Sequence, residues 1–295
     1  MQSLAQEVWR LRPELIACEG TMGELAWAWG AGNRKDAQNW NARVWFDGDT
    51  PLAWGWIYAP MSIIVSESER RMQPASLAWQ VHPDRPPLLD DVLDWFDTQV
   101  PDNDRETSVR QCDTDARARI DRHGYVRDDP NAPWGMLNMR DLREIEEPRL
   151  PPGYRFLTMR ELDDVPRRVE AHRVAWAPSS LTTEAYEDTM RTPPYRDDLD
   201  FAIEADTGIL VASAIGWFDE ANAVAEFEPV GTHPDYRQRG LGRSLLLSGM
   251  QRFRDAGATH AIVGCRGDAN YPIPKKLYRS VGFTELTREL RYVKA

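Results

Sequence analysis

An ordered set of landmarks occurs twice in this chain and constrains its fold more than any other feature. The tripeptide His-Pro-Asp stands at residues 82–84 and again at residues 233–235, 151 positions later. In each copy a strand-like run with Gly-Trp precedes the tripeptide, and a Gly-aromatic pair follows it. These pairs are Gly55-Trp56 and Gly216-Trp217, then Gly124-Tyr125 and Gly282-Phe283. An internal repeat in this order predicts two similar folding units.

The length of the chain agrees with two units, because 295 residues at roughly 150 per domain is the expectation for two domains. Residues 146–153 read Glu-Glu-Pro-Arg-Leu-Pro-Pro-Gly, a sequence that cannot continue a helix or a central strand. We therefore place the two domains at residues 1–148 and 149–295. The mixture of strand and helix patterns predicts an α/β (α+β) fold class.

Hydrophobic periodicity predicts the elements of the second unit. Strands are expected at residues 154–158, 200–204, 209–218, 223–230, 260–265 and 283–292. Helices are expected at residues 161–176, 182–190, 242–254 and 275–281. Pro166 fits the first of these helices only if it lies in the first turn, where its missing N–H costs nothing.

Composition excludes several classes of protein. No apolar run approaches the 18 or so residues that span a bilayer, so we expect no membrane contact. Residues 1–15 carry four charges and lack the apolar core of a secretory signal, so we expect a cytoplasmic location. Three cysteines without a CxxC pair argue against a disulfide framework and a structural zinc, and no metal is expected. The net charge of −11 opposes binding to nucleic acid and favours cationic small molecules.

Residues 237–244, Arg-Gln-Arg-Gly-Leu-Gly-Arg-Ser, join a predicted strand to a predicted helix. Glycines at such a junction let backbone N–H groups approach an anion at the positive end of the helix dipole, which is how proteins bind phosphate groups. The segment is neither a Walker A motif nor a GxGxxG fingerprint. A tight turn with solvated arginines is the alternative interpretation.

Two carboxylates share one face of the strand that precedes this segment. Side chains alternate along a strand, so Glu226 and Glu228 lie on the same side, together with Val224 and Val230. Pro229 removes a ladder donor and therefore predicts a bulge or a place where neighbouring strands separate. The alternative is that both glutamates are simply exposed.

At this point the chain resembles the GCN5-related N-acetyltransferase (GNAT) superfamily. Its signature Arg/Gln-x-x-Gly-x-Gly/Ala is met by Arg237, Gly240 and Gly242. A second family segment, Asn…Leu-Tyr…Gly-Phe, is similar to Asn270, Leu277, Tyr278, Gly282 and Phe283, with one extra residue after the asparagine. The resemblance covers residues 154–292 and implies tandem GNAT folds, each a mixed, mainly antiparallel sheet flanked by helices.

The resemblance also implies acetyl-CoA as co-substrate and a set of site residues. Glu226 matches the general base of members that use a glutamate, Tyr278 resembles the tyrosine that protonates the coenzyme A sulfur, and Glu228 is expected to contact the acceptor. Cofactor contacts are expected from Val230, Gly231, Thr232, Arg237, Gln238, Arg239, Gly240, Leu241, Gly242, Arg243, Ser244 and Asn270.

The first copy lacks the residues of this chemistry. Its tripeptide is followed by Arg85-Pro86-Pro87, and a proline has no N–H to offer a phosphate. Ala75 stands where Glu226 stands in the second copy, and Ile120 stands where Tyr278 stands. We interpret the first unit as a degenerate copy that serves stability or the acceptor site.

The sequence thus predicts an N-acetyltransferase that moves the acetyl group of acetyl-CoA to a primary amine of a small molecule, acting as a monomer or homodimer. Two other functions stay open. One is acetylation of a protein lysine or N-terminus, and the other is a sensor that binds acetyl-CoA without turnover.

Overall fold

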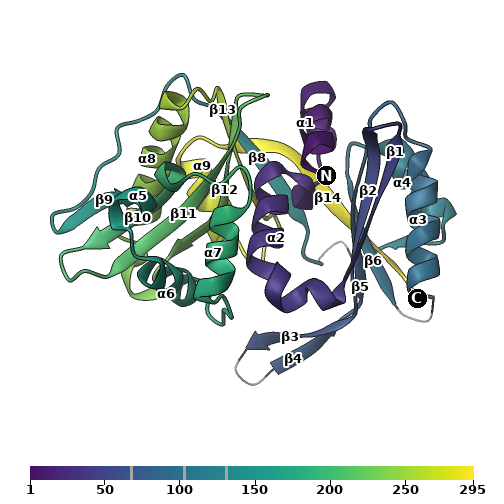
Figure 1. Cartoon of the computed structure of the whole chain (residues 1–295), viewed down its shortest axis with the longest axis horizontal. Helices are drawn as coiled ribbons and strands as arrows, with labels where there is room; N and C mark the ends of the chain where they lie inside the picture. The colour runs from purple at the N-terminus through teal and green to yellow at the C-terminus, as the bar shows by residue number, and fades with distance from the viewer. Residues whose placement is uncertain (67–68, 102–103, 130–131) are drawn as a thin grey trace.

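The computed structural model describes residues 1–66, 69–101, 104–129 and 132–295. Within these ranges one 12-stranded sheet runs through the whole molecule, in the order β1-β2-β5-β6-β14-β8-β13-β12-β11-β10-β9, with β7 paired to β14 (Figure 1). A separate hairpin, β3 (Met61–Ser66) and β4 (Glu69–Gln73), projects from the first half. The mixed α/β architecture agrees with the predicted fold class.

The second half matches the predicted elements closely. Its strands are β9 (Tyr154–Thr158), β10 (Asp200–Ala205), β11 (Leu210–Asp219), β12 (Val224–Thr232), β13 (His260–Arg266) and β14 (Thr284–Lys294). Its helices are α5 (Met159–Leu162), α6 (Val165–Ala175), α7 (Thr183–Arg191), α8 (Leu241–Asp255) and α9 (Ile273–Ser280). Strands β9 to β12 are antiparallel, and β13 is parallel to β12.

One predicted helix is wrong in its extent. Residues 161–176 form parts of two helices, α5 and α6, because Asp163 has a left-handed backbone with φ 45° that ends α5. Pro166 then falls in the first turn of α6, as the sequence required.

The first half contains β1 (Trp40–Asp47), β2 (Thr50–Tyr58), β5 (Ala75–Val81), β6 (Arg105–Arg110), β7 (Val126–Arg127) and β8 (Gly135–Asp141). Its helices are α1 (Gln2–Leu11), α2 (Met22–Asp36), α3 (Leu88–Gln99) and α4 (Thr114–Arg122). The order β5-α3-β6-α4-β7 repeats the order β12-α8-β13-α9-β14, which is the repeat expected from the sequence.

The repeated tripeptide forms the same local structure in both copies. The Nδ1 atom of His82 accepts a hydrogen bond from the N–H of Asp84 at 3.1 Å, and that of His233 accepts from Asp235 at 3.2 Å. The backbone N–H of each histidine also donates to a backbone carbonyl oxygen of an earlier strand, that of Leu52 in the first copy and that of Val211 in the second.

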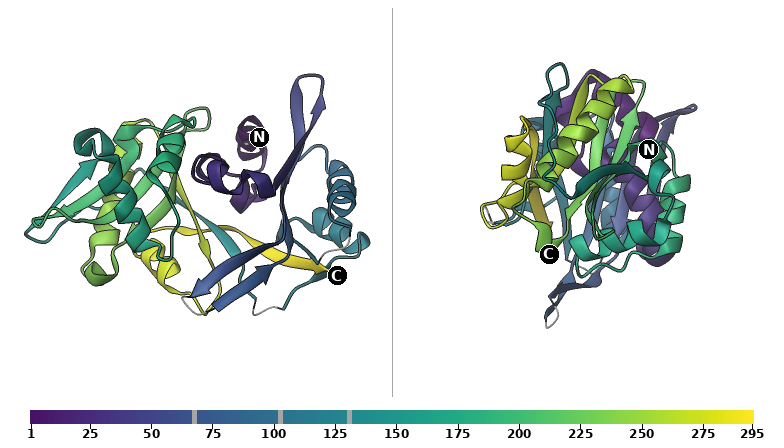
Figure 2. Two further views of the ribbon diagram at one scale, coloured as in Figure 1. Left: turned by 60° about the horizontal axis from the view of Figure 1, so that its bottom comes forward. Right: turned by 90° about the vertical axis from the view of Figure 1, so that its left-hand side faces the viewer.

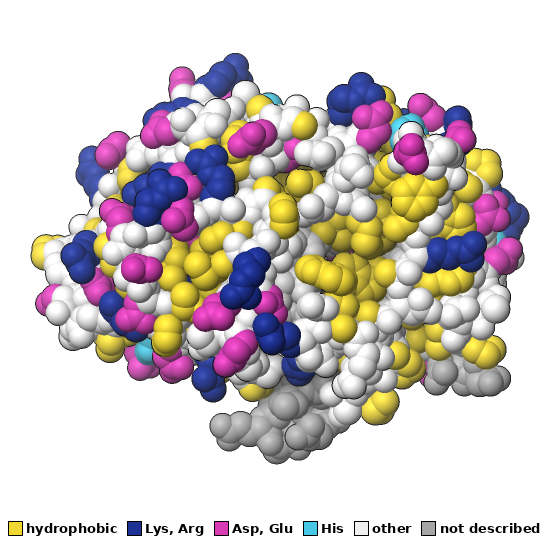
Figure 3. Space-filling view, in the orientation of Figure 1, with side chains coloured by type: hydrophobic (Ala, Val, Ile, Leu, Met, Phe, Trp, Pro, Cys, Tyr) yellow, Lys and Arg dark blue, Asp and Glu magenta, His cyan; other side chains and the backbone are white. Residues whose placement is uncertain are grey.

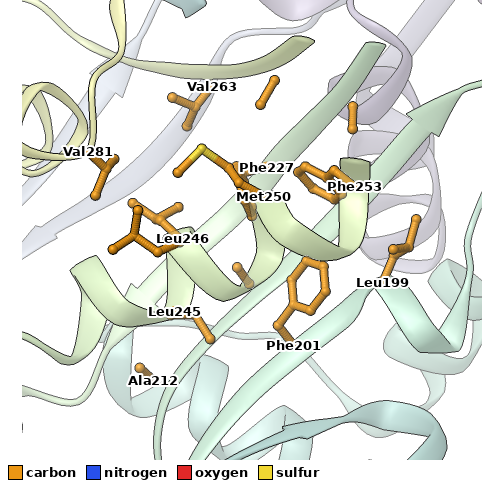
Figure 4. Close-up of a cluster of buried hydrophobic side chains, with 14 of the residues drawn as sticks. Leu199, Phe201, Ala212, Phe227, Leu245, Leu246, Met250, Phe253, Val263 and Val281 are labelled. Carbon is orange, nitrogen blue, oxygen red and sulfur yellow. The ribbon is translucent and has the colours of Figure 1, made fainter. Parts of the chain in front are cut away.

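The repeated Gly-Trp pairs have a packing explanation. A Cβ atom on Gly216 would lie 2.3 Å from the ring of Phe253 in α8, and one on Gly55 would lie 2.8 Å from the ring of Trp95 in α3. Each glycine therefore allows an aromatic ring of the covering helix to contact the strand backbone. Figure 4 shows the resulting core of the second half, where Leu246, Met250 and Phe253 of α8 pack on the strands.

The two halves exchange strands. β8 precedes the predicted boundary but lies between β13 and β14, with Gly135–Asp141 paired to β13 along its whole length. β14 begins beside β8 and ends between β6 and β7 in the first half, a path that Figure 2 shows as the long C-terminal strand. The division at residues 148 and 149 stays a prediction, since the sheet itself is shared across it.

Candidate active site

The strands β12 and β13 separate in the middle of the sheet. They pair from Val224 to Phe227 of β12, opposite His260 to Val263 of β13. Beyond this point Val230 to Thr232 stay paired with β11, whereas Gly264 to Arg266 stay paired with β8. The register of β11 and β12 shifts at Ile215, which lies opposite both Glu228 and Pro229. The bulge and the separation expected from Pro229 are thus confirmed.

The glycine-rich segment follows directly and enters α8. Gln238 and Gly240 have left-handed backbones, with φ 62° and 78°, and Gly240 is the N-cap of α8. A Cβ on Gly240 would meet no atom within 4 Å, so the backbone faces open space there. The first N–H groups of a helix have no intrahelical partner, and here they begin a 15-residue helix. The turn therefore has the geometry of an anion site.

The arginines of this segment are partly engaged by the protein itself. Arg237 donates to the carbonyl oxygens of Thr232 and Ala175, at 3.2 and 3.3 Å. Arg239 lies over the ring of Tyr236 at 4.8 Å. Arg243 forms an ion pair of 2.5 Å with Glu146 of the segment that joins the halves. These contacts hold the turn and fix α8 against the connecting segment.

Three predicted cofactor contacts have other partners within the protein. The side chain of Leu241 is buried in the core, so only its backbone faces the turn. The Ser244 hydroxyl donates to the carbonyl oxygen of Arg149. Asn270 is exposed, and its N–H donates to Asp268 before α9 begins at Ile273. Whether these residues contact a cofactor stays a prediction.

Glu226 caps a helix of the first half. Its Oε1 atom accepts from the Thr21 hydroxyl at 2.6 Å, and its Oε2 atom accepts from the Gly23 N–H at 2.7 Å, at the N-terminus of α2. Glu226 is 2% exposed, and this burial raises its pKa to about 7, although the hydrogen bonds from Thr21 and Gly23 act in the opposite direction. Such a carboxyl group exchanges a proton near neutral pH.

Glu228 lies at the opening, where the two strands separate. Its backbone carbonyl accepts from the Trp217 indole N–H at 2.6 Å, which fixes the bulge. Burial, and then the charge of Glu226, raise the pKa of Glu228 to about 8. The carboxylate of Glu24 on α2 also belongs to this group, because burial and then the charges of Glu228 and Glu226 raise the pKa of Glu24 well above its ordinary value.

Sequence reasoning missed Thr21, Gly23 and Glu24. The pattern Thr-x-x-Glu is a signal for the start of a helix, and the Thr21 hydroxyl does accept from the N–H of Glu24. That signal predicts where α2 begins but not that α2 packs on β12. Figure 1 shows α2 between α7 and β2, where it joins the two halves.

Tyr278 lies on α9 and is 6% exposed. In the described part of the chain its hydroxyl makes no hydrogen bond. Burial, followed by the charge of Glu228, raises the pKa of Tyr278 well above its ordinary value, so the hydroxyl keeps its proton at neutral pH. The structure thus brings Tyr278 close to the predicted acceptor carboxylate, with a proton to donate.

The corresponding opening in the first half is narrowed by a tryptophan side chain. β5 and β6 also pair in parallel, over Ala75 to Leu77, and then separate. Trp79 stands there at the position that Val230 has in the second copy, and its indole N–H donates to the carbonyl oxygen of Ser108 at 3.0 Å. The guanidinium of Arg110 covers the ring at 4.7 Å. A buried indole therefore occupies much of the space between these strands and leaves a pocket of about 80 Å³ beside it.

No group of three or more His, Cys, Asp or Glu side chains in the described residues is arranged to hold a metal ion. No described helix is both long and apolar enough to cross a membrane.

Comparisons with known proteins agree with this geometry. Residues 139–283 match the model of the acetyltransferase (GNAT) family. Mycothiol acetyltransferases of Saccharopolyspora erythraea and Saccharomonospora viridis are 26% and 28% identical to the chain over 70% and 63% of it, and over 69% and 67% of their own lengths. The fold is similar to that of a tandem GNAT protein from the clavulanic acid biosynthesis pathway, with a TM-score of 0.65 and 15% identity, over 99% of this chain and 93% of that one.

The family match covers the half that carries the signature turn and the separated strands, and the tandem neighbour shares the arrangement of both halves. Residues 139–283 therefore belong to the GCN5-related N-acetyltransferase family, the chain as a whole has the fold of a tandem GNAT protein, and it is an acetyl-CoA-dependent acyltransferase.

Proposed function

We propose that the protein transfers the acetyl group of acetyl-CoA to a primary amine of a small molecule. The observation that carries this proposal is the group of carboxylates at the opening beside the signature turn, where Glu226 and Glu228 have pKa values near 7 and 8. The positive charge of an arriving ammonium group would favour the ionised form of these carboxyl groups, which burial disfavours. The names of the mycothiol acetyltransferase relatives support a small-molecule acceptor.

The co-substrate is expected to lie across the opening. The backbone N–H groups at the start of α8 would hold its pyrophosphate, with Gly240 and Gly242 allowing close approach. The arm that carries the thioester would pass between β12 and β13, where residues 230–232 present backbone N–H groups for the thioester oxygen. One molecule per chain is expected, because Trp79 narrows the equivalent space in the first copy and prolines follow its tripeptide in place of the glycine-rich turn.

Each residue at the opening then has its own role in binding the amine or in moving a proton. Glu226 accepts a proton from the ammonium group, directly or through a water, and Glu228 holds the charged amine in place. The neutral amine attacks the thioester carbon, a C–N bond forms and the C–S bond breaks. Tyr278 donates its proton to the departing sulfur, and the nitrogen, which still carries one proton too many after the attack, gives that proton to the Tyr278 oxygen, directly or through a water.

The test is acetyl-CoA-dependent thiol release with a panel of small primary amines, beside a lysine-containing peptide. We expect release with at least one small amine, at a rate that rises through a pH of about 7 as Glu226 ionises. The Glu226→Gln variant should lack this rise and approach the wild type only where the amine is itself neutral. Release with the peptide alone would show a protein acceptor. Binding of acetyl-CoA without release for any acceptor would show a sensor.

A further inference from the structure

One face of α2 continues from the opening toward the surface. Glu24, Ala28, Ala31 and Lys35 follow one another at spacings of four, three and four residues, which places them on a single face of the helix. A Cβ on Gly264 would lie 3.8 Å from Oε1 of Glu24. Gly264 is the first residue of β13 beyond the last pair with β12, so Glu24 reaches the opening from the first half of the chain.

Glu24 and Glu228 have no partner of opposite charge. Among the described residues neither side chain makes a hydrogen bond or an ion pair, although both are half-buried and the charge of Glu228 raises the pKa of Glu24. Glu226 differs, since both of its oxygens are held by α2. Two neighbouring carboxyl groups keep a proton when no cation is near, because their negative charges repel each other, and both ionise readily only when a cation binds between them.

A second observation points to a ligand at the same place. The Tyr278 side chain is more than nine-tenths buried, yet its hydroxyl makes no hydrogen bond to the described residues and its oxygen stays accessible. Glu228 is the charge that raises the pKa of Tyr278 most, so the hydroxyl lies near the unpaired carboxyl groups. An accessible hydroxyl on a buried side chain is free to bond a molecule that enters the opening.

A groove of about 660 Å³ lies along the same face of α2, which is the size of a pocket for a drug-sized ligand. Both halves line it, with Ala28 and Ala31 on its floor and aromatic side chains beside them. Its other lining residues include Trp27, Trp40, Tyr58, His172, Ser180 and Thr182. Figure 3 shows hydrophobic side chains gathered on this face between α2 and β2.

The cations at the outer end of the groove are already paired. Arg34 is bonded to Asp188, and Lys35 donates to the Ser180 hydroxyl at 2.8 Å. The buried indole N–H of Trp40, by contrast, has no partner in the described residues. The groove therefore offers aromatic surface and hydroxyl groups along its length, and the unpaired carboxyl group of Glu24 lies one helical turn beyond its Ala28 end.

On the basis of the proposed function, we propose that Glu24 and Glu228 together bind the ammonium group of the acceptor, and that the groove along α2 holds the rest of it. The acceptor is then a primary amine on a ring-bearing body, and the degenerate first half supplies part of its site. Glu24 acts in recognition of the acceptor and not in proton transfer.

Tryptamine and propylamine test this assignment, because they share the ammonium group but only tryptamine has a ring system. Binding is measured by calorimetry on the full chain with coenzyme A present, so no turnover is needed. We expect Glu24→Gln to weaken tryptamine binding by about 10- to 100-fold, the effect of losing a hydrogen bond to a charged group. The control Glu7→Gln removes a carboxylate of the same half that pairs with Arg10 at the surface, and it should bind like the wild type.

The Ala31→Leu variant tests the groove separately. We expect it to weaken tryptamine binding while propylamine binding stays unchanged, and the ratio within one variant is independent of any loss of folded protein. Unchanged tryptamine binding in Glu24→Gln, or no tryptamine binding to the wild type, would overturn the proposal. A wild type that binds tryptamine through Glu24 but releases no thiol with any amine would refute the proposed function and leave the acceptor site standing.

Discussion

Replacing Glu226 by glutamine should change how the stability of the protein depends on pH. Burial raises the pKa of Glu226 from 4.5 to about 7 in the folded protein. The unfolded chain therefore ionises first as the pH rises, and the folded state loses stability through this window. An interval of about 2.5 pKa units, at about 1.36 kcal/mol each, gives a loss of about 3 kcal/mol between pH 4.5 and pH 7.

The assay is urea unfolding of the wild type and of Glu226→Gln from pH 4.5 to pH 8.5. Glutamine keeps the size of the side chain but accepts only one of the two hydrogen bonds, so it adds a cost that does not depend on pH. The difference in the free energy of unfolding should shift by about 3 kcal/mol in favour of the variant as the pH rises. The charge of Glu226 raises the pKa of Glu228, and this charge is absent from the variant. The pKa of Glu228 should therefore be raised less there, so Glu228 should contribute less to the pH dependence of stability.

Thr21→Val supplies the matched control. It removes the hydroxyl that lowers the pKa of Glu226, so the same transition should move to higher pH, whereas the carboxyl group stays. A difference between wild type and Glu226→Gln that is constant from pH 4.5 to pH 8.5 would show that Glu226 titrates as an ordinary carboxyl group. The assignment of Glu226 as a base poised near neutral pH would then be refuted.

Three further variants test other parts of the site. Tyr278→Phe should keep the fold and the affinity for acetyl-CoA and lower kcat by about 10- to 1000-fold, overlapping the usual effect of losing an acid group; an unchanged kcat would assign the proton to another donor. Gly240→Val should weaken acetyl-CoA binding in calorimetry because its side chain blocks approach to the backbone, and the strain of a β-branched residue at φ 78° should also lower the free energy of unfolding by about 1 to 3 kcal/mol. Trp79→Ala should lower the free energy of unfolding by about 3 to 5 kcal/mol, while calorimetry still finds one acetyl-CoA per chain; a second site would contradict our account of the first copy.

The sequence determined the elements and the chemistry that depend on local pattern. The strands and helices of the second half followed from hydrophobic period, because an element of either type needs one apolar face at its own repeat. The bulge followed from Pro229, which cannot donate to a strand ladder. The phosphate-type turn followed from glycines at the start of a helix. The repeat itself followed from the order of the two His-Pro-Asp copies.

Only the tertiary structure decided which segments meet across long distances in the chain. The exchange of β8 and β14 joins segments about 125 to 180 residues apart in the sequence. Neither strand differs in its local sequence pattern from a strand that pairs within its own half of the chain. The contacts of Glu226 with Thr21 and Gly23, and the position of Glu24 at the opening, depend on how α2 packs between the halves. A helix-start signal sets where α2 begins, but its neighbours are chosen by burial of whole faces, which no short stretch of sequence contains.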